Sequence, residues 1–434
     1  MSSDLPSQLP LQSLGEPIYR GSVQNLYVVP DHPNYIVCET TEAGSVFDVG
    51  SIFRIDGNDL NRAIFRHAMY GRLANPQTWK RVESALLKTS TLGETWRSQL
   101  MDGTLEAMLE SGAQTHHVGM LDSVTGELHS SGMPLHPSCY NVVRRFPVMK
   151  PPQRNVMGNF VFDYAQFHQS GTYVVPLEYI VRFGVTSGSS ILRKYEALGE
   201  KERRSYELEL GLNGPMSAWQ MLDRPIYDLT SKYEPEDRPV TKQEALLMSG
   251  LSSQSFLSTI KMALLGAWAV RELLEEIGLQ LWDLKWEFAV DGDDLFFVDT
   301  IDADSFRATG TVEVEGRRLI IHYNKQAMRD YYRVICADWY AGVNAAKQEA
   351  AKTGLPFKEV LRSGQVAGKY PQTPEVAPEF LTLQAKKTAL IKQHVLGEMQ
   401  ADALRLSLEQ AGKEEAEFYR GQGKLDELLT LNGL

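Results

Sequence analysis

The stretch LWDLKWEFAVDGDDLFFVDTIDADSFR, residues 281–307, has the pattern of a β-hairpin with one apolar face and one acidic face. Side chains of a strand alternate between the two faces of a sheet. In the first strand the apolar face carries Leu284, Trp286, Phe288 and Val290, and the opposite face carries Asp283, Lys285 and Glu287. We expect the first face in a core. The second is either a solvated surface with an ion pair or a site with a chemical role.

The length of the turn decides which of these charges meet. If residues 291–293 form a three-residue connection, Lys285 pairs with Asp299 of the return strand, and Glu287 lies one pair away. Two carboxylates beside a lysine suit a magnesium-nucleotide site, because Mg²⁺ prefers hard oxygen ligands and a cation can contact the phosphates. A two- or four-residue connection is expected to separate them.

The composition indicates a globular protein and excludes some functions. The 434 residues are 43% hydrophobic, and the formal net charge is −11. This charge disfavours general binding to nucleic acids or anionic membranes, both of which need a positive field. Three widely spaced cysteines give no disulfide framework and no structural zinc motif. The N-terminal residues lack the pattern of a signal peptide, and no apolar run of membrane-spanning length occurs, so we expect a cytoplasmic protein.

The order of polar, strand-like and helical segments predicts five parts. Residues 1–17 are expected to form a flexible arm, 18–148 a mixed first lobe, 149–173 an insertion loop, 174–339 a second lobe, and 340–434 a helical extension. The helices of the extension are amphipathic, which leaves open whether they pack on the body or form a homo-oligomer.

Three ordered segments resemble the signatures of the SAICAR synthetase (phosphoribosylaminoimidazole-succinocarboxamide synthase) family. DLKWEF (283–288), VDTIDADSFR (298–307) and YNKQAMRDYY (323–332) are similar to the family's DTKFEFG, DEISPDSCR and YDKQFVRDYL. Upstream, PLEYIVRFGVTSGSS (176–190) resembles its PVE-x-VVR-x5-GS segment, and SVFDVGSIFRIDGNDLN (45–61) resembles SAFDV…IPGKGEVLN. The resemblance covers roughly residues 18–335.

The resemblance implies a fold and an activity. The fold is an α+β, two-lobed architecture related to protein kinases and ATP-grasp enzymes, with antiparallel sheets and packed helices. The activity is ligation of L-aspartate to a carboxylated aminoimidazole ribotide in purine biosynthesis, with ATP and Mg²⁺, through an acyl phosphate. Small-molecule substrates are implied, with no nucleic-acid or membrane partner. Lys285, Glu287 and Asp299 are then catalytic, with Glu287 and Asp299 as metal ligands and Lys285 also contacting the nucleotide.

Further residues acquire roles through the same resemblance. The nucleotide is expected at Gly21, Ser22 and a cation at Arg144 or Arg145. The substrates are expected at Asp48, Arg182, Ser189, Asp304, Ser305, Arg307, Lys325 and Arg329. Arginine suits phosphate because its planar fork donates two hydrogen bonds. Ser189 matches less closely than Arg182, since the Gly-Ser pair lies one residue further from the arginine than in the family pattern.

Departures from the family leave alternatives open. Where the family reads GKVRDLY over the nucleotide, residues 21–27 read GSVQNLY, so two cations and one acid are missing. The acid pair of the family's DEI segment becomes Asp299-Thr300. A ligase for another amine or another carboxylated heterocycle therefore remains an alternative. So does a non-catalytic binding or scaffold protein whose C-terminal helices carry the function.

Overall fold

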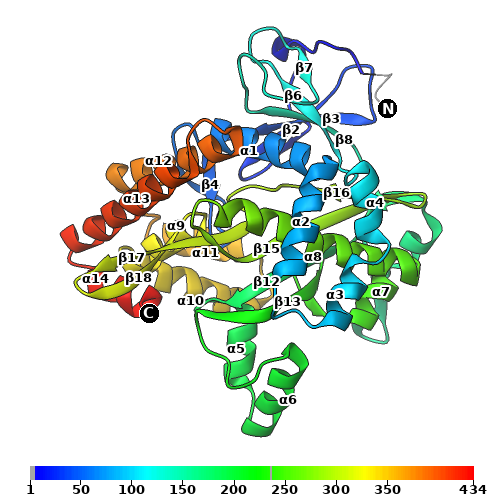
Figure 1. Ribbon diagram of the computed structural model, residues 1–434. Helices are drawn as coiled ribbons and strands as arrows, with labels where there is room; N and C mark the ends of the chain where they lie inside the picture. The colour runs from blue at the N-terminus through cyan, green and yellow to red at the C-terminus, as the bar shows by residue number, and fades with distance from the viewer. Residues whose placement is uncertain (1–4, 235–236) are drawn as a thin grey trace.

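The computed structural model describes residues 5–234 and 237–434, which are organised around two main antiparallel sheets (Figure 1). The smaller sheet has the order β1-β2-β3-β8-β6-β7. Its strands are β1 (Tyr19–Arg20), β2 (Gln24–Val28), β3 (Tyr35–Thr40), β6 (His117–Leu121), β7 (Leu128–His129) and β8 (Tyr140–Arg144). This sheet lies above the larger body of the molecule, where most helices are found. The architecture is therefore α+β, as expected.

The larger sheet is built around the hairpin of residues 281–307. Its order is β14-β13-β12-β15-β17-β18, and β11 and β16 also pair with β15. The strands are β11 (Thr172–Val174), β12 (Leu177–Val185), β13 (Gln220–Ser231), β14 (Pro239–Val240), β15 (Gln280–Asp291), β16 (Asp294–Val298), β17 (Phe306–Val314) and β18 (Arg317–His322). The apolar face predicted for β15 is confirmed, because Leu284, Trp286, Phe288 and Val290 are all buried in the main core.

A long helix, α8 (Ser253–Glu275), packs against β12 and β15. Its start is fixed by Ser252, whose side chain accepts a hydrogen bond from Ser255 N. Beyond its C-terminus Gly278 has φ of +76°, a left-handed conformation that glycine adopts without strain, so the chain turns there. Helices α1 (Asn58–Leu73), α2 (Pro76–Lys88), α3 (Glu94–Met101) and α4 (Thr104–Ser111) share the same core as α8.

The two main sheets separate near residue 148, where the sequence predicts the end of the first lobe. Helices α1 to α4 do not follow this boundary. Residues of α1 to α4 were assigned to the first lobe, but α2, α3 and α4 contact α8, and their apolar side chains join the core of the larger sheet. The two sheets are also linked directly, because His116 N donates to Phe297 O at 2.9 Å and Phe297 N donates to Gln114 O at 3.0 Å. The hairpin therefore lies where the two sheets meet.

Two other expected segments differ from the prediction. Residues 5–17 are not a loose arm: a short 3₁₀ helix (Leu11–Ser13) forms, and Leu9 and Leu14 pack against the smaller sheet. Residues 1–4 of the predicted arm lie outside the described residues. The predicted insertion loop contains an exposed hairpin of β9 (Gln153–Val156) and β10 (Asn159–Phe162), followed by a 3₁₀ helix (Ala165–Gln169).

The remaining elements extend this framework. A second small hairpin consists of β4 (Ala43–Ser45) and β5 (Ser51–Arg54). Helices α5 (Ser190–Ala197) and α6 (Glu200–Leu210) project from the body opposite the smaller sheet (Figure 1), and α7 (Lys242–Ser249) precedes α8. The C-terminal part is helical: α9 (Gln326–Val334), α10 (Ala337–Thr353), α11 (Phe357–Val366), α12 (Pro378–Leu396), α13 (Ala401–Gly421) and α14 (Leu425–Asn432).

The C-terminal helices pack on the body of the molecule. Helix α12 contacts α1, and α13 contacts both α12 and β17. This is one of the two arrangements that the sequence left open. Within the described residues no helix has the length and apolar character needed to cross a membrane.

Candidate active site

The hairpin of β15 and β16 has a two-residue turn, one of the lengths that the sequence left open and one that was expected to separate the charges. Asp291 pairs with Asp294, and Glu287 pairs with Val298. Asp299 is therefore not the cross-strand partner of Lys285. The turn residues are Gly292, with φ of +61°, and Asp293. Glycine at the first central position is typical of a type II′ turn, whose twist suits a hairpin. The sequence pattern could not distinguish a turn of two residues from one of three.

The two carboxylates meet nevertheless, because Asp299 lies just beyond β16 in a left-handed conformation. Its φ is +67°, and its carbonyl oxygen accepts a hydrogen bond of 2.7 Å from Tyr70 Oη. Aspartate tolerates this conformation better than most side chains. The backbone turn brings its carboxylate to the same lysine that Glu287 contacts, Lys285. A local backbone conformation thus replaces the expected cross-strand pairing.

Lys285 contacts three acids at once. Its Nζ lies 2.7 Å from Glu287 Oε1, 2.7 Å from Glu178 Oε1 of β12, and 3.6 Å from Asp299 Oδ2. A second cation that the sequence did not reveal, Lys232, follows β13 and forms an ion pair with Glu287. We define the lysine–carboxylate cluster as Glu178, Lys232, Lys285, Glu287 and Asp299.

Burial and mutual repulsion set the protonation of the cluster. Burial, followed by the neighbouring Asp299 carboxylate, raises the pKa of Glu287 to about 7 despite the two lysines. Burial also acts to raise the pKa of Asp299, but Lys285 and Lys232 outweigh it and hold that pKa below its usual range. Burial opposes the charge of Lys285, yet the three acids raise its pKa well above normal. Near neutral pH the cluster therefore holds one proton that a bound cation can displace.

On one side of the cluster a cavity of about 230 Å³ lies between the smaller sheet and the hairpin. We call it the upper pocket. Glu287, Asp299, Thr300 and Lys232 line it from below, and Gln24, Ile36 and Val143 are among the residues that line it from the smaller sheet. Its cations are Arg66, Arg144, Arg145 and Lys232. Four cations and an apolar wall are suited to a ligand that combines phosphates with a flat ring.

Only some of the residues predicted to bind the nucleotide line the upper pocket. Arg144 lines the upper pocket, where it forms an ion pair with Asp291 and lies 4.8 Å above the Phe146 ring. Gly21 and Ser22 form the turn between β1 and β2 and do not line this pocket, although Gln24 of the same hairpin does. Arg66 of α1 was missed by sequence reasoning, and its only signal is the helical spacing that puts it one turn after Arg62.

On the other side of the cluster a larger cavity of about 450 Å³ opens, which we call the lower pocket. Lys285 lines it, together with seven of the eight predicted substrate residues: Asp48, Arg182, Asp304, Ser305, Arg307, Lys325 and Arg329. Arg193, Arg333 and Lys347 add further positive charge. Segments that lie far apart in the chain thus converge on one pocket.

Ser189 is the predicted substrate residue that does not line the lower pocket. It is fully buried and caps the N-terminus of α5, where its hydroxyl accepts a hydrogen bond of 3.3 Å from Leu192 N. Its neighbours Gly188 and Ser190 line the pocket instead, and Ser190 Oγ accepts a hydrogen bond of 3.0 Å from Arg182 Nη2. The one-residue offset noted in the sequence explains the shift.

The cations of the lower pocket are compensated to different degrees. Arg182 forms ion pairs with Asp228 at 2.7 Å and Asp283 at 3.2 Å. Arg307 Nε lies 3.0 Å from Asp283 Oδ1. Arg329 forms no ion pair with any described residue, and burial, followed by the nearby Arg307 and Arg333, lowers its pKa. Arg329 is therefore a lower-pocket cation whose charge is available to an anionic ligand.

A buried network holds the loop between the two pockets. Asp302 is fully buried, and its Oδ2 accepts a hydrogen bond of 2.8 Å from Arg66 Nη2 and one of 3.3 Å from Arg62 Nε. Arg62 also lies 2.9 Å from Asp304, which lines the lower pocket. Ser305 Oγ donates to Asp302 O at 2.9 Å, so this hydroxyl already has a structural partner.

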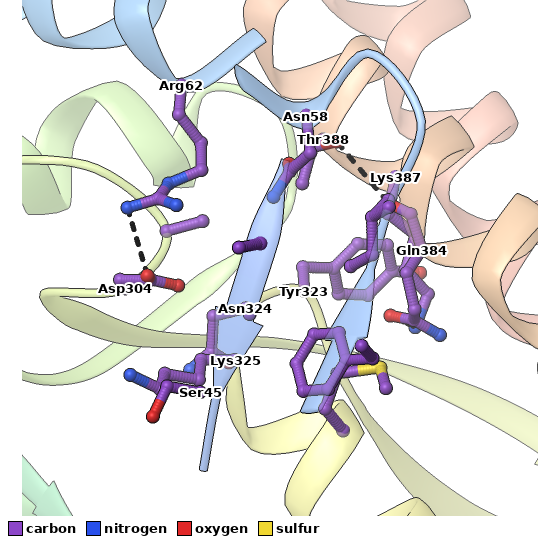
Figure 2. A pocket seen from close by; sticks show the side chains of 16 residues that line it. Ser45, Asn58, Arg62, Asp304, Tyr323, Asn324, Lys325, Gln384, Lys387 and Thr388 are labelled. Carbon is purple, nitrogen blue, oxygen red and sulfur yellow. Dashed lines mark hydrogen bonds and ion pairs between the residues drawn. The ribbon is translucent and has the colours of Figure 1, made fainter. Parts of the chain in front are cut away.

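A small third cavity, of about 30 Å³, borders the lower pocket and shares Asp304, Asn324 and Lys325 with it. Figure 2 shows Arg62 reaching Asp304 on one side of this cavity, and Gln384, Lys387 and Thr388 on the other. These last three residues belong to α12. The C-terminal helices thus come close to the substrate side of the site.

Comparison with known proteins gives one family. Residues 146–346 match the SAICAR synthetase family. A sequence of Archaeoglobus fulgidus, provisionally named as a phosphoribosylaminoimidazole-succinocarboxamide synthase, is 28% identical over 269 residues, which are 60% of this chain and 73% of its own. The synthase of Thermoplasma volcanium is 29% identical over 193 residues, 44% of this chain and 61% of its own. Residues 146–346 of this chain are therefore similar to the SAICAR synthetase family, and the relatives with this similarity are named as its synthases.

Two solved structures align over most of the chain with low scores. The SAICAR synthase of Saccharomyces cerevisiae, solved with SAICAR, gives a TM-score of 0.47 at 15% identity over 90% of this chain and 98% of its own. The enzyme of Ehrlichia chaffeensis gives 0.40 at 14% identity over 82% of this chain and 100% of its own. The similarity to this family rests on the sequence matches alone.

Proposed function

We propose that the protein is an ATP-dependent ligase that joins L-aspartate to the carboxylate of a carboxylated aminoimidazole ribotide in purine biosynthesis. The observation that carries the proposal is the position of the lysine–carboxylate cluster between two pockets. Glu287 and Asp299 line the upper pocket, Lys285 lines the lower pocket, and Lys285 Nζ lies 2.7 Å from Glu287. The upper pocket suits a nucleotide and the lower pocket suits a phosphorylated, carboxylated substrate.

The reaction activates a carboxylate, because a free carboxylate is a poor acyl donor. A carboxylate oxygen of the ribotide attacks the γ-phosphorus of ATP, and the bond to the bridging oxygen breaks, releasing ADP. The aspartate nitrogen then attacks the acyl carbon and loses a proton, and inorganic phosphate leaves. Lys285 lies between the upper and lower pockets, where the phosphoryl group would pass from ATP to the ribotide. A fixed cation there stabilises the charge that spreads over the phosphoryl oxygens.

Glu287 and Asp299 are the residues that would hold Mg²⁺. They fit because both carboxylates line the upper pocket and both lie close to Lys285 Nζ. Among the described residues no group of three or more His, Cys, Asp or Glu side chains is arranged to hold a metal, so the remaining ligands would come from phosphate oxygens and water. Bound there, the ion would neutralise charge on the transferring phosphoryl group.

The missing cations of the glycine hairpin have substitutes in the proposed site. Gln24 occupies the hairpin where the family has charged residues, and its Oε1 accepts a hydrogen bond of 3.4 Å from Arg66 Nη1. Arg66 and Lys232 thus bring positive charge to the upper pocket from α1 and from the segment after β13. These side chains favour a catalytic protein over a scaffold protein without nucleotide binding.

We expect the binding of MgATP to weaken as the pH falls through 7. The folded pKa of Glu287, about 7, means that metal binding must displace its proton below that pH. Between pH 8 and pH 6 the affinity should fall about tenfold through this group. Calorimetry in buffers of different ionisation enthalpy measures the proton released. Glu287→Gln provides the control for titration of ATP itself, and an unchanged pH profile in this variant would contradict the assignment.

The product identifies the activity directly. The protein is incubated with MgATP, L-aspartate and the carboxylated ribotide, and the mixture is examined by mass spectrometry. The proposal predicts a new species with the summed mass of aspartate and the ribotide less one water, absent when any one component is omitted. Formation of ADP with another amine, but not with aspartate, would replace the substrate and retain the reaction class.

A further inference from the structure

The C-terminal helices are tied to the segment that supplies Lys325 and Arg329. Lys387 Nζ of α12 donates a hydrogen bond of 2.8 Å to His322 O. Tyr323 Oη donates to Leu408 O of α13. The approach is close enough that a Cβ on Gly412 of α13 would lie 2.8 Å from Tyr323 Oη. The backbone just before α9 is thus held by two helices that lie outside the family match at residues 146–346.

A chain of side-chain hydrogen bonds runs from α14 to the lower pocket. Asn432 Nδ2 donates to Asp330 Oδ2 at 2.8 Å. Gln326 Nε2 donates to the other oxygen, Asp330 Oδ1, at 2.9 Å. Arg329 Nη1 in turn donates to Gln326 Oε1 at 3.2 Å. Asn432, Asp330 and Gln326 are buried, with exposed fractions of 2%, 3% and 6%. Arg329 lines the lower pocket at the other end of this relay.

Each bond of the relay restricts the next one. Burial raises the pKa of Asp330 to about 6, which shows that its charge is costly in this environment and needs donors. With Asn432 on one carboxylate oxygen, the other oxygen is left for Gln326, and the amide of Gln326 is thereby oriented with its oxygen toward Arg329. Arg329 is repelled by Arg307 and Arg333, and it forms no ion pair with a described carboxylate. Gln326 is therefore a main restraint on its position.

We propose that Asn432 is a positioning residue for the lower pocket: through Asp330 and Gln326 it holds Arg329 where an anionic substrate group binds. The C-terminal helices then complete the substrate site rather than serving only as a cover for the core. The identity of the anion as the ribotide rests on the proposed function. The hydrogen-bond relay itself is independent of that identity.

The test uses a reciprocal exchange of donor and acceptor. Asn432→Asp places a second acceptor against Asp330 and breaks the first bond of the relay. The double variant Asn432→Asp/Asp330→Asn restores one donor and one acceptor between the same positions. His394→Ala is the matched control, because His394 lies on α12 and bonds to Leu273 O of α8 at 2.9 Å instead of to the substrate segment.

The readouts separate positioning from general damage. Asn432→Asp should raise the KM and the dissociation constant of the ribotide about tenfold, which is the scale of one charge-assisted hydrogen bond, with the KM of ATP unchanged. The double variant should recover most of this loss, and His394→Ala should change neither constant. Melting temperatures of all variants are compared to show that each protein is folded.

Several outcomes would overturn the inference. These are an unchanged ribotide constant in folded Asn432→Asp, an equal loss for ATP and ribotide, or no recovery in the double variant. Binding is measured by calorimetry and needs no turnover. If wild-type protein binds the ribotide but forms no product, the proposed function fails while the inference about Asn432 still stands. If the ribotide does not bind, inorganic phosphate is the probe. Failure of wild-type protein to bind phosphate would also overturn the inference.

Discussion

Replacing Lys285 by methionine should lower kcat by about a hundredfold to a thousandfold, the loss typical of removing one electrostatic group from an acyl- or phosphoryl-transfer site. The ammonium lies within 3.6 Å of Glu178, Glu287 and Asp299 and lines the lower pocket, so its charge acts where the two pockets meet. The KM values of ATP and the ribotide should change much less than kcat, because other cations line each pocket. Steady-state kinetics with each substrate varied in turn measures this split.

Two further variants keep this prediction testable. Lys285→Met leaves three acids with Lys232 as their remaining close cation, so a loss of stability is expected as well. Lys285→Arg retains the charge and should fold, with partial loss of kcat from altered reach. Arg271→Met removes a cation paired with Glu275 on α8 that lines neither pocket, and it should leave kcat unchanged. Equal kcat values in folded Lys285→Met and wild-type protein would refute a catalytic role.

The second large effect is expected when Arg329 is replaced: substrate binding should weaken, while the stability of the fold should increase. Arg329→Met should raise the KM of the ribotide by about tenfold to a hundredfold, because it removes a lower-pocket cation that forms no ion pair with a described carboxylate. It should also raise the melting temperature. Burial, then Arg307 and Arg333, lowers the folded pKa of Arg329 below its unfolded value, so the fold disfavours its charge at all ordinary pH values.

Arg333→Met provides the contrast. Arg333 lines the same pocket, but its Nη1 lies 3.7 Å from Asp330 Oδ1, so its removal leaves a buried acid with less compensation. Ribotide binding should weaken here too, while the melting temperature should fall. Thermal denaturation with and without the ribotide measures both quantities. A lower melting temperature for Arg329→Met would show that its charge is compensated in a way that the structure does not reveal.

The strand pattern predicted much of the fold around the site. Alternation along β15 assigned its buried face correctly, because a period of two in polarity directly reflects which face is covered. The chain turns after α8 at Gly278, whose left-handed backbone conformation is one that glycine adopts readily beyond the end of a helix. The division of helices α1 to α4 between the lobes was not predictable, since it depends on tertiary contacts with α8 that leave no local signal.

The site was predictable where the family resemblance supplied long-range order, and much less so elsewhere. Seven of the eight predicted substrate residues line one pocket, although their individual roles stay predictions. Pattern alone could not give the two-residue turn or the left-handed Asp299 that compensates for it. Sequence patterns also did not reveal the residues that other elements bring to the upper pocket, Lys232 and Arg66, or the C-terminal residue that bonds to Asp330, Asn432. Each is an ordinary polar residue in its own segment.

The central claim is that the two pockets work together across the lysine–carboxylate cluster, and a coupled assay of ADP release tests it most directly. Wild-type protein is compared with Asp299→Asn in the presence of MgATP, the carboxylated ribotide and L-aspartate, with each component omitted in turn. The account predicts sustained ADP release only when all three substrates are present, and its collapse in the folded variant. ADP release at the same rate without the ribotide, or no release from protein that binds both ATP and the ribotide, would contradict it.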